Sequence, residues 1–184
     1  MKKIATLALA ASALIAAPAM AQNVTGTITL NGNVASKCSV SPGSGNTFAQ
    51  TVDFLELAQA NGTLRSGLAT DFGTRSATVV CNTGTPKVSV DANPLATGGT
   101  AATGYDNSID YTASVAVTAV GTNAGPFINA SNAAAGTATA VGSALATSAS
   151  NVQITTSGYG TNNATDVLVA GAYTGNIIVV ISPN

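Results

Sequence analysis

The chain has 184 residues, of which 46% are hydrophobic and only 7% are charged, with six basic residues, seven acidic residues and no histidine. This balance excludes the basic surface that nucleic acid or anionic lipid requires. The absence of histidine excludes nucleophilic catalysis by a Ser-His or Cys-His pair.

Residues 1–21 have the pattern of a secretory signal peptide. Lys2 and Lys3 precede an apolar run that ends in Ala19-Met20-Ala21, and small residues at these positions are typical of a signal peptidase site. A retained membrane anchor is the alternative, which the cleavage site argues against. We therefore expect export, a mature protein of 163 residues without stable membrane insertion, and a net charge of −3, because four basic and seven acidic residues remain.

The segment VTGTITLNGNV, residues 24–34, alternates almost perfectly. Threonine and asparagine take one face of an extended chain. The other face carries Val24, Gly26, Ile28, Leu30, Gly32 and Val34. This period of two predicts a strand with one apolar face, although it lies directly after the cleavage site.

The only two cysteines, Cys38 and Cys81, both lie in the exported part. In an oxidising compartment they are expected to form one disulfide, and two unpaired buried thiols are the alternative. In the chain-entropy account, a bridge across about 43 residues stabilises a fold by roughly 4 kcal/mol. A metal site is not expected, because the chain has no histidine and no second pair of cysteines.

Short strands separated by turn formers follow. Residues 55–60, LELAQA, are the one place where a helical turn is expected, and residues 129–150 are read as a long hairpin or a loose loop. The remaining strands are expected at 38–40, 51–55, 77–81, 88–90, 109–120, 152–155 and 173–181. The sequence therefore predicts an all-β antiparallel sandwich.

The C-terminal run, residues 173–181, is apolar on both faces, which is typical of a central strand covered on both sides or flanked by a partner across the core. The sequence ends three residues later, so we expect an incomplete Ig-like sandwich that lacks its last strand. Such a sandwich would expose an apolar groove beside residues 173–181. Donation of residues 24–30 to a second copy would fill it and build a head-to-tail filament.

The alternative is a self-contained secreted Ig-like surface or carbohydrate-binding domain, whose N-terminal strand fills its own groove. Only Asn31, Gly32 and Asn33 separate the donor segment, residues 24–30, from Val34, where the chain's own fold is expected to start, and this short link favours exchange between copies. An adhesin tip would need a second, receptor-binding domain, for which 163 residues leave no room.

The segment GTITLNGNVASKC, residues 26–38, resembles the start of chaperone–usher pilins, and FGTRSATVVCNTGTPKVSV, residues 72–90, is similar to the second-strand region of the archaic, spore coat protein U-like pilins. Gly171, fourteenth from the end, matches a glycine typical of pilin C-termini. Type 1 fimbrial pilins usually carry a penultimate tyrosine, where this chain has Pro183. The resemblance covers residues 22–90 and 167–184.

The resemblance implies a structural subunit of a surface pilus that supports adhesion or biofilm formation. A periplasmic chaperone would hold the subunit, and an outer-membrane usher would exchange the chaperone strand for the donor strand of another copy or a related pilin. Residues 22–32 would be the donor extension and 33–184 the pilin domain. The inserting residues would be Val24, Gly26, Ile28 and Leu30, and the acceptor groove would be lined by Tyr173, Ile177, Val179 and Ile181.

An enzyme is not expected. Asp106 and Asp110, or Asp53 and Glu56, are better read as turn-capping and solvated carboxylates than as a catalytic pair. Tyr159, between two glycines, is read as a packing residue rather than a platform for a sugar. No phosphate-binding loop or cofactor motif is present, so no cofactor is expected.

Overall fold

The computed structural model describes residues 25–43 and 45–184, so the signal peptide and Val24 lie outside the described residues. The chain divides into two units, one ending at Val34 and the other comprising Ala35–Asn184, and each is described by itself. Residues 25–34 carry no secondary structure, and the side chains of Ile28 and Leu30 are 87% and 90% exposed. The alternating pattern therefore forms no strand here, because a strand needs a partner for its backbone groups.

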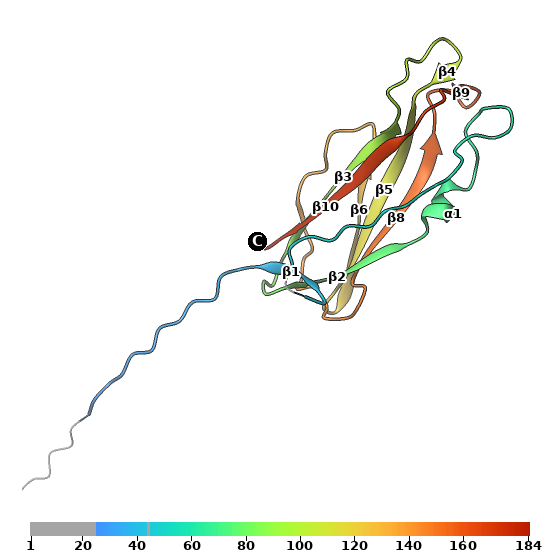
Figure 1. Cartoon of the computed structure of the whole chain (residues 1–184). Coiled ribbons are helices and arrows are strands. Elements are labelled where there is room, and N and C mark those ends of the chain that lie inside the picture. The colour runs from blue at the N-terminus through green and yellow to red at the C-terminus, as the bar shows by residue number, and fades with distance from the viewer. Residues whose placement is uncertain (1–24, 44) are drawn as a thin grey trace, which may run out of the picture. The chain divides into compact units, whose positions relative to one another are not determined.

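The second unit is an all-β sandwich that approaches a barrel (Figure 1). The strands follow the order β1-β2-β8-β5-β3-β10, with β6 paired to β5 and β7 to β3, while β4 and β9 form a separate small sheet. The elements are β1 (Cys38–Ser41), α1 (Leu68–Phe72), β2 (Arg75–Cys81), β3 (Lys87–Ala96), β4 (Tyr105–Asp106), β5 (Ser108–Ala119), β6 (Thr122–Ala130), β7 (Thr139–Ala140), β8 (Val152–Gly160), β9 (Val167–Leu168) and β10 (Thr174–Ser182).

The core lies between the inward faces of β2, β3, β5 and β8. Strand β5 is the clearest case, because every second residue from Ile109 to Ala119 is buried while most of the residues between them are half-exposed. Its first residues pair with β3 and the rest with β6 and β8, so β5 joins the two parts of the sandwich. Alternation with a period of two thus produced the strand that the sequence predicts at 109–120.

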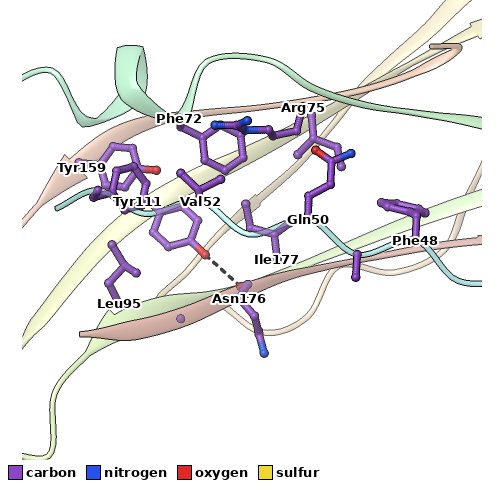
Figure 2. A pocket seen from close by; sticks show the side chains of 14 residues that line it. Phe48, Gln50, Val52, Phe72, Arg75, Leu95, Tyr111, Tyr159, Asn176 and Ile177 are labelled. Atoms are coloured by element: carbon purple, nitrogen blue, oxygen red, sulfur yellow. Dashed lines mark hydrogen bonds between the residues drawn. The ribbon is translucent and has the colours of Figure 1, made fainter. Parts of the chain in front are cut away.

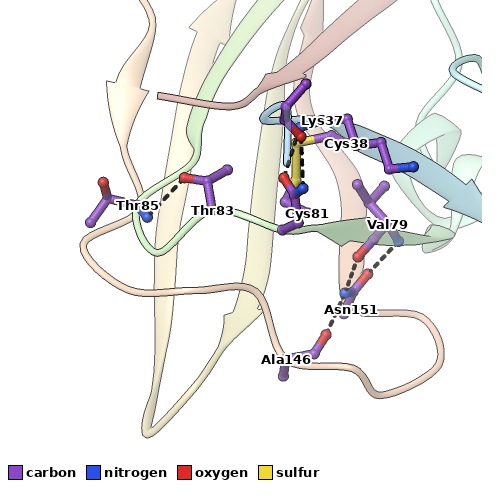
Figure 3. The surroundings of a disulfide bond; sticks show 10 residues. Lys37, Cys38, Val79, Cys81, Thr83, Thr85, Ala146 and Asn151 are labelled. Carbon is purple, nitrogen blue, oxygen red and sulfur yellow. Dashed lines mark hydrogen bonds between the residues drawn. A yellow bond between two sulfur atoms is a disulfide. The ribbon is translucent and has the colours of Figure 1, made fainter. Parts of the chain in front are cut away.

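Cys38 and Cys81 form the expected disulfide, with an S–S distance of 2.04 Å, and lie directly opposite each other on β1 and β2 (Figure 3). Beside it, the buried Asn151 accepts a hydrogen bond from Val79 N at 2.8 Å and donates to the carbonyl of Val79 at 2.7 Å. The side-chain amide thereby replaces a strand partner for β2, where the chain enters β8.

Two local predictions differ from the structure, and a third, for residues 129–150, is met by its loose-loop alternative. Residues 51–55 are coil rather than a strand, because no neighbouring strand pairs with them. Residues 55–60 form no helical turn; instead Ala58 bridges Leu64, and the short helix lies later, at α1. Residues 129–150 are mostly loop, with β7 as the only strand assigned wholly within them among the described residues.

Candidate interaction groove

Strand β10 has one open edge. It pairs with β3 in a continuous antiparallel register from Asn176↔Asn93 to Ser182↔Lys87, and no described strand pairs with its other side. The expectation of a strand covered on both sides is therefore wrong for the described chain, whereas the alternative of a strand flanked across the core agrees with its inner face. Ile178 and Val180 on the outer face are about half-exposed, whereas Ile177, Val179 and Ile181 pack against the core.

The open edge borders a groove, which we define by its two sides: the coil wall, residues 48–58, and residues 168–177, which lead into β10. One cavity of about 320 Å³ lies toward β2 and β8, and a second of about 700 Å³ lies toward β9. Coil-wall residues and residues leading into β10 line both cavities, so the two are parts of one groove. Figure 1 shows the coil wall as the teal trace between β1 and α1.

Aromatic side chains form the floor of the first cavity. Tyr111 stacks on Tyr159 with ring centroids 5.3 Å apart, and Phe54 of the coil wall meets Tyr159 edge-on at 5.7 Å. Phe72 of α1 and Ile177 of β10 complete the apolar lining (Figure 2). Tyr159 is thus a packing residue, as its sequence context suggests, and the floor is shaped to receive apolar side chains.

The Tyr111 hydroxyl lies between β3 and β10, 2.8 Å from the carbonyl oxygen of Asn93 and 2.9 Å from that of Asn176 (Figure 2). Burial, followed by the nearby Tyr159, raises the pKa of Tyr111 to about 12. Burial also raises the pKa of Tyr159 and of Tyr173. Tyr111 is therefore a neutral donor at physiological pH, and its hydroxyl ties β10 to β3 where the register of the two strands shifts.

Most of the coil wall is held by side chains, and only its end makes backbone pairs, between Ala58 and Leu64 and from Arg65 N to the Leu57 carbonyl. Gln50 Nε2 donates to the carbonyl of Ser76 at 2.7 Å, and Arg65 donates to the carbonyls of Phe54 and Glu56. Arg65 also pairs with Asp71 on α1, with both side chains partly exposed. Residues 48–55 are thus held in place although their backbone groups pair with no strand.

Two of the four predicted groove residues line the groove, and two do not. Ile177 lines the first cavity and Tyr173 the second, where its hydroxyl donates to the carbonyls of Val169, at 2.9 Å, and Asp106, at 3.1 Å. Val179 and Ile181 face the core farther along β10 without lining either cavity. The structure explains why position 171 is a glycine. Its φ is +155°, and a Cβ there would lie 2.4 Å from Thr97 Oγ1.

No known family, curated protein or solved structure matches this chain. The described residues include no cluster of three or more potential metal ligands of the His, Cys, Asp or Glu type. None of the helices in residues 25–43 and 45–184 is long and apolar enough to cross a bilayer.

Sequence reasoning missed the opposite side of the groove. Phe48, Val52, Phe72 and Arg75 come from segments far from β10 in the sequence, and only the fold brings them to the first cavity. One signal was available in the sequence. Residues 50–57, QTVDFLEL, contain closely spaced apolar residues without a clear helical period.

Proposed function

We propose that the protein is the structural subunit of a surface pilus, assembled when the N-terminal extension of one copy inserts into the groove of another. The observation that carries this proposal is the open edge of β10 beside an apolar groove. A flat edge with apolar neighbours aggregates unless something covers it.

The extension of the same chain has the matching chemistry. Ile28 and Leu30 are almost fully exposed, and together with Gly26 they share one face of an extended segment. Burial of each large side chain contributes about 1.5–3 kcal/mol before association costs. The backbone of the extension would pair with the open edge of β10, as in β-strand addition.

A head-to-tail arrangement follows when the donor and the groove belong to different copies. Each copy offers one extension and one groove, so the contact does not close and generates a filament. The resemblance to chaperone–usher pilins extends this proposal to a periplasmic chaperone that shields the groove, an outer-membrane usher that exchanges the strands, and a final location at the cell surface. No nucleotide is needed, because the completed sandwich supplies the free energy.

Insertion within one copy is the second candidate, because the same side chains would fill the same groove. Expression of residues 22–184 and of a chain that starts at Asn33, followed by size-exclusion chromatography and electron microscopy, tests the proposal. We expect fibres and SDS-resistant ladders from the first chain, and monomers that depend on a chaperone from the second. Two stable monomers with equal melting temperatures would contradict donor-strand assembly.

A further inference from the structure

Arg75 is a half-buried cation at a mostly apolar cavity of the sandwich. It is the first residue of β2, and its side chain lines the first cavity, where Cζ lies 5.7 Å from the centroid of the Phe72 ring (Figure 2). Its Nε atom is buried and has no hydrogen-bond partner among the described residues. A buried donor without an acceptor costs about 1–3 kcal/mol.

The cavity itself offers Arg75 no counter-charge. None of the residues that line it is acidic, and the ion pair found among the described residues joins Arg65 to Asp71 instead. An occupant of this cavity is therefore favoured if it brings an oxygen acceptor to Arg75 as well as apolar side chains to the floor.

The N-terminal extension restricts which acceptor that can be. Residues 24–34 contain no acid, and Thr25, Thr27 and Thr29 lie on the face opposite the inserting side chains. Backbone carbonyls are then the acceptors that remain. A guanidinium beneath the strand reaches a carbonyl most easily where no inward side chain intervenes, and among residues 24–30 that position is Gly26.

We propose that Arg75 is a specificity-determining residue of the groove, which donates a hydrogen bond to a backbone carbonyl at Gly26 of the inserted strand and excludes a side chain at that position. The proposal rests on the proposed function, because it assumes that residues 24–30 of another copy occupy the groove. In this arrangement, one polar contact contributes to the specificity of an otherwise apolar groove.

The test measures binding of a fluorescent synthetic peptide of residues 22–33 to the full mature chain by anisotropy. The chain carries Ile28→Asn and Leu30→Asn, so that its own extension does not compete and no new charge is offered to Arg75. We expect Arg75→Met to weaken peptide binding at least tenfold and Arg75→Lys to restore part of it. Lys87→Met is the matched control, since it removes a cation that does not line the cavity.

A second arm begins with changes in the peptide alone, so its first comparison is independent of how Arg75 variants fold. Gly26→Leu in the peptide should weaken binding to the groove with Arg75 at least tenfold, whereas Thr27→Leu, on the opposite face, should not. Arg75→Ala should abolish the difference between the Gly26→Leu peptide and the unmodified peptide, because the volume above Phe72 becomes free, while both peptides bind without the Arg75 hydrogen bond.

The outcomes separate the two proposals. If the unmodified peptide does not bind the groove with Arg75 in place, the proposed function fails and this inference fails with it. If the Arg75→Met substitution leaves peptide binding unchanged, or if Gly26→Leu carries no penalty, Arg75 has no selective role while donor-strand assembly stands.

Discussion

Two edge strands of this sandwich are built in opposite ways. Strand β6 is interrupted: Pro126 lacks an N–H, and the register with β5 shifts between Val115 and Val117. Strand β10 carries neither proline nor charge, and after a register shift between Thr174 and Asn176 its pairing with β3 is continuous to Ser182. Natural proteins use proline and bulges to protect edges that stay exposed. The contrast agrees with the proposal that β10, rather than β6, is the edge that receives a partner.

The largest expected effect comes from removal of the partner of β10. Ile28→Asp places a carboxylate where the proposal buries an apolar side chain, which costs about 3 kcal/mol or more and slows assembly by about 100-fold or more. Thr27→Asp, on the opposite face, is the matched control and should assemble almost normally. Fibre formation by the two variants is measured by light scattering and electron microscopy. An equal loss of fibres in both would contradict the role of the inserting face, because it would point to the added charge instead.

The third edge, β1, is short and is locked by the Cys38–Cys81 disulfide. Replacement of both cysteines by alanine should lower the free energy of unfolding by about 2–5 kcal/mol, because the bridge restricts a long loop in the unfolded chain. Guanidinium unfolding of an assembly-blocked variant such as Ile28→Asp, with and without the cysteines, measures this loss. An unchanged midpoint would show that β1 is held by its ladder with β2 alone.

Tyr111→Phe tests how firmly β10 is attached to β3. Loss of the hydroxyl should cost about 1–2 kcal/mol, because the carbonyls of Asn93 and Asn176 lose the donor that they share. The pKa of Tyr111 is raised to about 12 in the folded state, against about 10 in the unfolded chain, so its contribution is complete below pH 10 and is lost as the pH rises through 12.

Unfolding of the assembly-blocked chain from about pH 8 to about pH 12 measures this dependence. The Phe variant should lose less stability above about pH 10, with a residual loss from Tyr159 and Tyr173, whose pKa values are also raised. The same alkaline loss in both chains would mean that Tyr111 does not hold the strands together.

The smallest effect is expected at β6. Pro126→Ala restores an N–H on the protected edge and should increase light scattering of the assembly-blocked chain only slightly. Pro183→Ala, outside any strand, is the control. Assembly as fast as that of the unblocked chain would show that β6, too, is an edge available for pairing.

Strong alternation made the central strands predictable from sequence. Residues 109–120 and 152–155 have a buried and an exposed face, and both became strands. Strand β6 was missed, because TNAGP reads as a turn and only the neighbouring β5 makes it a strand. Residues 51–55 have strand-like side chains but no partner, so they stay coil.

The groove was half predictable for the same reason. Ile177 belongs to a local apolar pattern that the sequence reveals, and it lines the first cavity. Phe72, Tyr111 and Arg75 come from three other elements and meet there only through long-range pairing. A period along the chain identifies the faces of a strand, but it does not identify what lies across the core.

The central claim is that the open edge of β10 receives the extension of another copy. A photo-crosslinking amino acid at position 28, in an equal mixture of isotopically heavy and light chains assembled together, tests it directly by mass spectrometry. The account predicts crosslinks between position 28 and residues 168–182 that include heavy–light pairs at about half of the total. Crosslinks confined to one isotope would place the strand in its own groove and contradict assembly by exchange between copies.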